Sequence, residues 1–143
     1  MFDGKVKIIR NEIIGYYSWD TSDGSINEGY GVNEWSEADL MKLLNSGYDS
    51  ENIGGSLYWN AKSGTCYTME NNATESCDFT STGLKNVATR NLIAETTYYT
   101  RGHNDYKIYV NEMYDKERVS GTVVNATPSW TGKIAVAYPS DYG

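Results

Sequence analysis

The feature that most constrains this chain is its pair of cysteines, Cys66 and Cys77, which lie on either side of a short polar segment. Asn71 and Asn72 stand in the middle of that segment and suit a turn, so we expect a hairpin-like loop with the two cysteines facing each other. A disulfide that closes a loop of this length stabilises a fold by about 3 kcal/mol. A zinc site and free thiols are the alternatives; zinc prefers four ligands, and the chain adds one histidine to its two cysteines. We favour the disulfide, which places the protein in an oxidising compartment.

Length and composition fit one folded domain, and we predict that residues 1–143 form a single globular unit. Hydrophobic residues make up 39% of the chain and charged residues 22%, which favours a folded chain over a disordered one. The aromatic residues are mostly of the kind with a polar tip, since there are 13 Tyr and 4 Trp against 2 Phe. Such side chains serve both half-buried surfaces and binding faces.

Charge and hydropathy argue against two classes of partner. The net charge is −7 and no basic stripe offsets it, so the chain repels phosphate backbones and we predict no nucleic-acid partner. The apolar runs are too short for a membrane segment. The residues after Met1 lack the basic start and apolar stretch of a signal peptide, which taken alone favours a cytoplasmic protein. The cysteine pair outweighs that argument, and we predict an extracellular or cell-surface location.

The clearest predicted helix begins at Ser36, which can cap the first-turn amides, with Asp39 in the acidic position of a capping box. Trp35 and Leu40 occupy the two positions of a hydrophobic staple. Leucines at 40, 43 and 44 form one apolar stripe, and Gly47 suits a left-handed end. A second predicted helix is capped by Ser81 or Thr82 and continues to residue 95, fading near Tyr98 and Tyr99.

The remaining segments suggest short strands and turns. Residues 5–10 and 13–19 alternate like the two strands of a hairpin, and residues 56–60 resemble an extended segment. Residues 106–110 and 133–138 are expected to be strands, and residues 112–118 a helical turn with Tyr114 facing inward. The sum is an α+β fold in which two helices pack on a small mixed or antiparallel sheet.

Little in the chain points to catalysis. The single histidine, His103, lies among loop-forming residues, and nothing specifies a nucleophile or an orienting group beside it. Paired carboxylates could come from Glu12, Asp20, Glu28 or Asp39, but sequence cannot pair them, and Asp39 has a capping role. We therefore predict no enzyme, no catalytic residue, no metal site and no cofactor.

Several stretches of the chain resemble one family. They are SWDTS at 18–22, GVNEWS at 31–36, GSLYWN at 55–60, the loop 66–78 with FTS at 79–81, and WTGK at 130–133 continuing to YPSDYG at 138–143. The family is a set of uncharacterised surface proteins from Gram-positive gut bacteria, whose longer members look like type IV pilin-like or pseudopilin-like secreted proteins. Their globular head is similar to C-type-lectin-like and formylglycine-generating-enzyme-like folds. The resemblance implies a C-type-lectin-like fold and a surface location.

The chain departs from that family in two respects. The prepilin leader is absent, and the head of the family continues beyond residues 138–143 through further Trp-rich and strand segments. The chain also ends inside what looks like a turn. We therefore expect an incomplete fragment of the full domain, without the N-terminal anchor.

These observations predict an extracellular binding or adhesion domain that recognises glycans or other surface proteins. Sugar sites stack aromatic faces on the ligand and hydrogen-bond it with amide side chains, and this chain is rich in Tyr, Trp and Asn. The predicted ligand contacts are Tyr30, Tyr58, Trp59 and Trp130, whereas Trp35 is assigned to the helix staple. The alternatives are a structural pilin-like subunit head and, less favoured, an enzyme of the formylglycine-generating fold.

Overall fold

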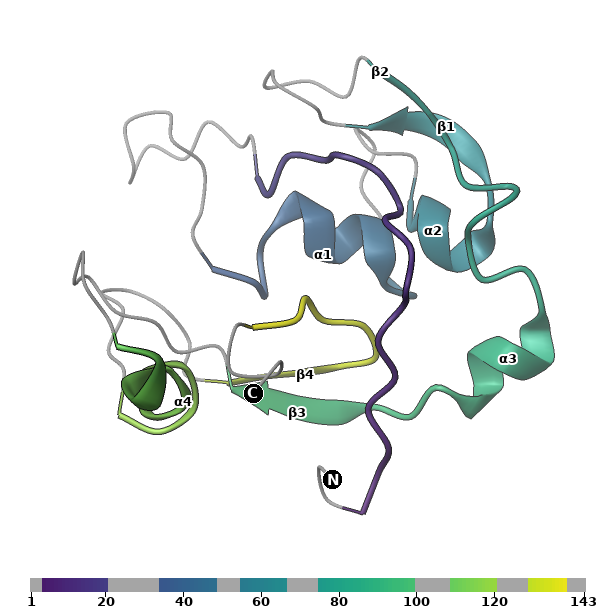
Figure 1. The fold of residues 1–143 in the computed structure, drawn as a ribbon. Coiled ribbons are helices and arrows are strands. Elements are labelled where there is room, and N and C mark those ends of the chain that lie inside the picture. The colour runs from purple at the N-terminus through teal and green to yellow at the C-terminus, as the bar shows by residue number, and fades with distance from the viewer. Residues whose placement is uncertain are drawn as a thin grey trace.

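The computed structural model describes residues 4–20, 34–48, 55–66, 75–99, 109–120 and 129–138. Within these ranges the chain forms short helices and two antiparallel two-stranded sheets (Figure 1). In chain order the elements are α1 (Asp39–Leu44), α2 (Leu57–Asn60), β1 (Ser63–Cys66), β2 (Glu75–Asp78), α3 (Val87–Leu92), β3 (Thr96–Tyr99), α4 (Val110–Arg118) and β4 (Ser129–Gly132). The α+β class is confirmed, with every described strand pairing antiparallel.

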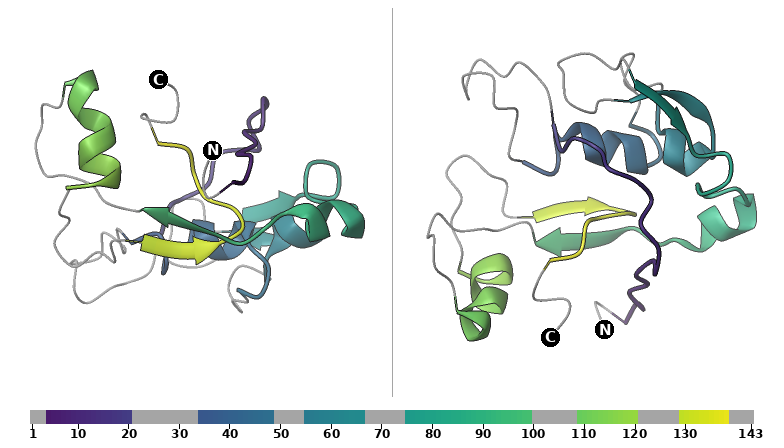
Figure 2. Two further views of the ribbon diagram at one scale, coloured as in Figure 1. Left: turned by 90° about the horizontal axis from the view of Figure 1, so that it is seen from below. Right: turned by 45° about the horizontal axis from the view of Figure 1, so that its top comes forward.

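Each sheet is a two-stranded ribbon. In the first, β1 pairs with β2 so that Gly64 is opposite Cys77 and Cys66 is opposite Glu75. In the second, β3 pairs with β4 so that Tyr98 is opposite Trp130. Helices α1 and α2 lie between the two ribbons, while α3 and α4 lie at the margins (Figures 1 and 2). A two-stranded ribbon is marginal by itself, so each must gain its stability by packing on α1 and α2.

The core lies where α1 and α2 meet the two ribbons. Its largest fully buried apolar side chains are Phe79, Met41 and Leu57. Burying side chains of this size stabilises the fold by about 2 kcal/mol each. The other members of this buried cluster are Trp35, Ala38, Leu43, Leu44, Tyr58, Cys66, Cys77 and Trp130. Both cysteines and two of the predicted ligand residues are therefore core residues.

The first helix is confirmed, but its predicted start is wrong. It begins at Asp39, and Ser36 donates its hydroxyl to Glu34 Oε1 at 2.8 Å instead of capping the helix. The amide of Leu40 donates to the carbonyl of Trp19 at 3.0 Å, so a distant segment satisfies a first-turn amide that the sequence assigned to a local cap. The helix ends at Leu44, with Asn45 as an extended C-cap, so Gly47 does not cap the helix directly; it has a φ of +75° in the turn that follows.

The predicted N-terminal hairpin is wrong. Residues 4–20 contain no strand, although their sequence alternates. The aliphatic side chains of Val6 and Ile8 are 79% and 89% exposed, so they face solvent and not the core. Alternation alone does not specify a strand when no neighbouring strand offers its edge.

The segment at 56–60 is a helical turn and not a strand. Ser56 and Ala61 both have a φ of +50°, so the chain reverses on each side of α2 and enters β1 only at Ser63. The final predicted strand is also misplaced. The strand is β4 at 129–132, and residues 134–136 are partly buried against the core without strand pairing.

The second predicted helix is shorter than expected. It forms as α3, with Asn86 accepting from the amide of Ala88 at 2.8 Å in place of a Ser81 or Thr82 cap. None of its residues is buried. Beyond it the chain enters β3, so the helix does not extend to Tyr98 and Tyr99.

The predicted turn at 112–118 forms as α4, but its orientation is wrong. Tyr114 is 62% exposed, and the residues that α4 buries are Glu117 and Arg118. The predicted strand at 106–110 lies mostly outside the described residues, and Val110 begins α4.

Candidate functional site

Three of the four predicted ligand residues are buried. Tyr58 is 8% exposed, Trp59 is 8% exposed and Trp130 is 7% exposed, while Tyr30 lies outside the described residues. Trp35, assigned to structure, is 3% exposed. Side chains with so little open surface contribute mainly to packing, so a ligand must use neighbouring groups for most of its contacts.

Trp130 lies at the centre of a group of aromatic rings. Its ring centroid is 5.8 Å from that of Trp35, at an interplanar angle of 87°, and 5.8 Å from that of Tyr98. Tyr48 lies on another side at 6.4 Å, and Trp19 contacts Trp35 at 5.3 Å. Contacts of this geometry stabilise a fold by about 1 kcal/mol each beyond the area that they bury. This group joins β3 and β4 to the segments on either side of α1.

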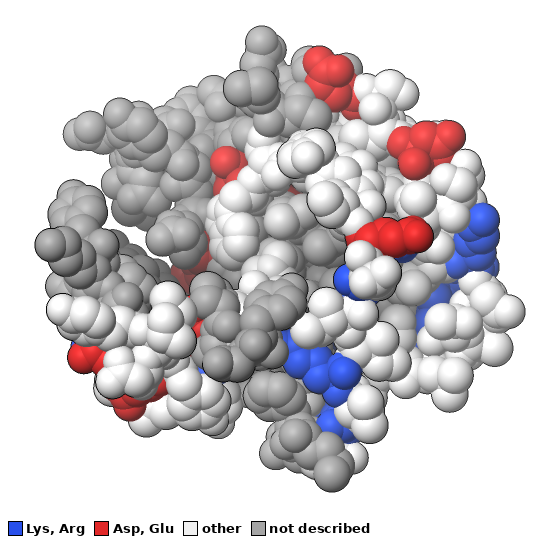
Figure 3. All heavy atoms as spheres, in the orientation of Figure 1, with Lys and Arg blue, Asp and Glu red and all other residues white. Residues whose placement is uncertain are grey.

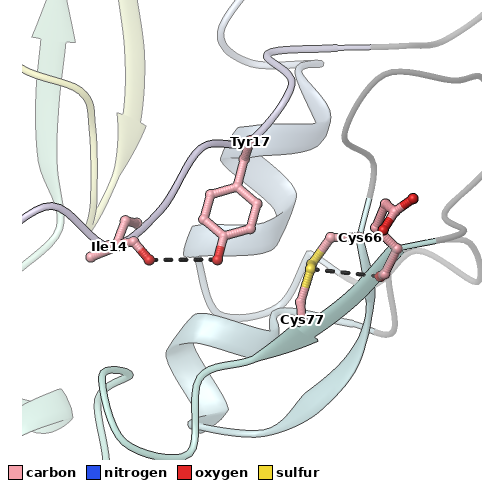
Figure 4. Close-up of a disulfide and its surroundings, with 5 residues drawn as sticks. Ile14, Tyr17, Cys66 and Cys77 are labelled. Carbon is pink, nitrogen blue, oxygen red and sulfur yellow. Dashed lines mark hydrogen bonds between the residues drawn. A yellow bond between two sulfur atoms is a disulfide. The ribbon is translucent and has the colours of Figure 1, made fainter.

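Tyr58 belongs to a second group of rings beside the disulfide. Its ring meets Phe79 edge to face at 5.7 Å, and Tyr17 packs on Phe79 at 5.3 Å. Figure 4 shows Tyr17 next to the bond between Cys66 and Cys77, with its hydroxyl aimed at the carbonyl of Ile14. Burial raises the pKa of the Tyr17 hydroxyl.

The disulfide between Cys66 and Cys77 is present, which confirms the predicted pairing. It links β1 to β2 with a Cα–Cα distance of 5.8 Å and closes the segment between them. The two cysteines are only 1% and 5% exposed, so the bond is also part of the core. The predicted Asn71–Asn72 turn lies outside the described residues.

Three cations from distant segments meet at Tyr58 and Trp59. Arg10 Nη1 lies 3.4 Å from the Tyr58 hydroxyl and donates to the carbonyl of Thr82 at 2.7 Å. Arg90 donates to the carbonyl of Trp59 at 3.3 Å. The Lys133 ammonium lies 5.2 Å from the centre of the Trp59 ring, in cation–π range.

Two further lysines extend this group. Lys62 lies two residues beyond the end of α2, and its carbonyl accepts from the amide of Phe79 at 3.0 Å. The carbonyl of Lys85 accepts from Arg90 at 3.5 Å. The side chains of both lysines are exposed. We call Arg10, Lys62, Lys85, Arg90 and Lys133 the basic cluster.

Gly83 is the reason that the loop before α3 can approach α2. A β-carbon at this position would lie 2.5 Å from the carbonyl oxygen of Tyr58 and 2.8 Å from that of Phe79. The amide of Leu84 donates to the carbonyl of Tyr58 at 3.0 Å, which holds the two segments together. The close approach lets Arg90 reach the carbonyl of Trp59.

Two carboxylates near the basic cluster already have partners. Asp78 Oδ1 accepts from the Thr80 amide at 2.8 Å and from the Thr80 hydroxyl at 2.5 Å. These bonds, the hydroxyl bond foremost, lower the pKa of Asp78. Glu12 Oε2 lies 3.6 Å from Arg10 Nη2. The hydrogen bond with Tyr58 and, to a smaller degree, the neighbouring Glu12 raise the pKa of Arg10.

In the described part of the chain no group of three or more His, Cys, Asp or Glu side chains is arranged to hold a metal ion. None of the described helices is both long enough and apolar enough to cross a membrane. His103 and Glu28 lie outside the described residues. Of the carboxylates considered as a catalytic pair, Glu12 forms an ion pair with Arg10, and Asp39 forms one with Lys42 at 3.2 Å. These two carboxylates are therefore engaged with cations and not with each other.

Sequence reasoning missed the basic cluster because its members are far apart in the chain, at positions 10, 62, 85, 90 and 133. Contacts at Tyr58 and Trp59 bring Arg10, Arg90 and Lys133 together, and the backbone of Lys85 contacts Arg90. Comparison with known proteins adds nothing to this geometry, since no protein-family model, curated protein or solved structure matches the chain.

Proposed function

We propose that this chain is an extracellular binding domain of a bacterial surface protein, and that its ligands are glycans. The observation that carries the proposal is the disulfide between Cys66 and Cys77, which lies inside the core. A structural disulfide of this kind forms where thiols are oxidised, outside the reducing cytosol. The sequence is rich in Tyr and Trp, whose rings can stack on sugars and whose polar tips can hydrogen-bond them.

The aromatic side chains that are exposed, and so available to stack on a sugar, are not the ones predicted from the sequence. Because Tyr58, Trp59 and Trp130 are buried, exposed tyrosines are the better stacking groups. Tyr109 and Tyr114, at the start and middle of α4, are 72% and 62% exposed. An exposed tyrosine offers both a face for stacking and a hydroxyl for hydrogen bonding.

A glycan array probed with the oxidised protein tests this proposal. We expect binding to at least one class of glycan or mucin, and weaker binding after Tyr109→Ala combined with Tyr114→Ala. Tyr16→Ala is the matched control, since Tyr16 is 89% exposed on a different segment. Absence of binding to every glycan and mucin on the array would contradict the proposal.

A pilin-like subunit head is the second candidate. It is favoured by the exposed aliphatic side chains of residues 4–20, where Ile8 is 89% exposed and Ile13 is 76% exposed. Large apolar groups grouped on a surface are typical of protein contacts. An antibody to this domain should label filaments on producing cells if it is a subunit, and should label scattered points if it is a solitary adhesin.

An enzyme of the formylglycine-generating kind requires reactive thiols. Both cysteines of the chain are engaged in the disulfide, so we propose no catalytic activity. A free-thiol assay on native protein tests this point, and two titratable thiols would revive the enzyme.

A further inference from the structure

We infer that the basic cluster is a binding site for acidic glycans, meaning sugars that carry carboxylates or sulfates. This inference rests on the proposed glycan-binding function, and it adds to the tyrosines of α4 a second surface, at α2, together with the class of glycan that this surface would bind. The protein as a whole is acidic, with 12 Lys and Arg against 19 Asp and Glu. The starting observation is that several of its cations nevertheless contact one another's neighbours around α2.

Convergence on one short helix brings the cations together. Arg90 and Lys133 contact the carbonyl and the ring of the same residue, Trp59, and Arg10 contacts the preceding residue, Tyr58. The three charged groups therefore contact adjacent residues of α2, although they come from segments far apart in the chain. Figure 3 shows basic side chains over the side of the molecule that carries α3 and beside the N-terminal segment, with acidic side chains near α4, over β1 and β2, and next to the basic ones near the centre of the view.

Most of these cations are not neutralised. Among the residues that the structure describes, Lys62, Lys85, Arg90 and Lys133 have no carboxylate within ion-pair distance. Asp78, adjacent in space to Lys62 through the strand pairing, is held by Thr80. Like charges that lie close together without a counter-charge oppose folding, and an anionic ligand would remove that cost.

The geometry of the cluster suits a chain-like anion more than a single small ion. Lys62 and Lys85 are exposed and free to move toward a ligand, whereas Arg90 is fixed by carbonyls of Trp59, Leu84 and Lys85. The Lys133 ammonium is held over the Trp59 ring. Arg90 and Lys133 would bind anionic groups at set positions, while Lys62 and Lys85 could move to meet others. Several cations around one helix therefore suit a polymer that repeats its anionic groups along its length. The remote acidic charge of the protein is largely screened at physiological salt.

The test compares three soluble probes by calorimetry: a heparin oligosaccharide, a hyaluronan oligosaccharide and a neutral dextran of similar size. We expect binding to the heparin or hyaluronan probe, weakening as sodium chloride rises from low to high concentration, and no binding to dextran. Lys62→Gln combined with Lys85→Gln should weaken that binding about fivefold, because each exposed ion pair contributes modestly.

Matched controls separate this inference from the proposed function. Lys5→Gln removes the same kind of charge from the N-terminal segment, where the exposed Lys5 donates to the carbonyl of Glu95, and should leave binding unchanged. Lys85→Gln is the matching single-charge variant within the basic cluster. Each variant must keep the melting temperature of the parent and its disulfide. Binding of neutral glycans that is indifferent to salt and to the lysine variants would overturn this inference and leave the proposed function standing. Failure to bind any glycan, acidic or neutral, would overturn both.

Discussion

The side-chain amide of Asn45 forms a pair of hydrogen bonds with the backbone of Ile134. Asn45 Oδ1 accepts from the Ile134 amide at 2.8 Å, and Asn45 Nδ2 donates to the Ile134 carbonyl at 2.9 Å. The same nitrogen donates to the carbonyl of Met41 at 3.0 Å. The Asn45 side chain is only 1% exposed. Its amide makes with Ile134 the two hydrogen bonds that a neighbouring strand would make, and so it holds the segment after β4 against the end of α1.

We predict that Asn45→Ala lowers the free energy of unfolding by about 3 kcal/mol, because it leaves buried backbone groups of Ile134 without partners. Asn45→Asp keeps the acceptor but places a charge against two carbonyl oxygens, so we expect at least as large a loss. Urea denaturation measures both. Asn91→Ala, an exposed asparagine in α3, is the control and should change stability by less than about 0.5 kcal/mol. Equal stability of the Asn45→Ala variant and its parent would sink the strand-partner interpretation.

Reduction of the disulfide is predicted to cost about 3 kcal/mol, because the unfolded chain regains the freedom of the closed loop. Thermal unfolding of the oxidised and reduced protein measures the difference. In the double variant Cys66→Ala with Cys77→Ala, the reductant should have no further effect. A reductant-dependent shift in that double variant would show that something other than the disulfide is responsible.

Two glycines are predicted to differ in their tolerance of alanine. Gly83→Ala should cost about 3 kcal/mol, because its β-carbon would lie 2.5 Å from a backbone oxygen that cannot move away easily. Gly47→Ala should cost about 1 kcal/mol, since nothing lies within 4 Å and only the positive φ of +75° opposes the new side chain. Chemical denaturation ranks the two variants. The reverse order would mean that the approach of the 80–85 loop to α2 is looser than described.

The hydrogen bonds from Thr80 to Asp78 predict a pH-dependent effect. They lower the pKa of Asp78, so their contribution to stability is present above the unfolded value of about 3.9 and is lost as the pH falls through the folded value. Thr80→Ala should therefore be less stable than the parent near pH 6 and indistinguishable from it in strong acid. Denaturation across this pH range tests the prediction, with Ser81→Ala as an exposed control. A stability difference that persists unchanged in strong acid would argue against the Asp78 carboxylate as its source.

Sequence patterns predicted correctly those features of the fold that depend on contacts between residues close together in the chain. The apolar stripe of α1 follows from side-chain spacing, and the left-handed Gly47 in the turn after the helix follows from the conformational freedom of glycine; both are found. The pairing of Cys66 with Cys77 also follows from a short polar loop. In each case the residues that settle the structure are near neighbours in the chain.

The predictions that were wrong concern features that depend on contacts between residues far apart in the chain. The start of α1 depends on the carbonyl of Trp19, and the path of residues 134–136 depends on Asn45. The helical turn of α2 has strand-like composition, but left-handed Ser56 and Ala61 enclose it. The basic cluster escaped prediction for the same reason, because its cations meet only once α2, α3 and the segment after β4 have packed together.

The burial of the cysteines sets how the cross-link can be lost. A reducing agent must reach a sulfur atom, yet Cys66 and Cys77 are almost wholly enclosed by the core beside Phe79. Attack then requires the β1–β2 ribbon to lift away from α1 and α2, so the lifetime of the bond depends on how often the ribbon opens as well as on the reductant. In the folded protein the disulfide is therefore protected from reductants by the core packing that it also stabilises.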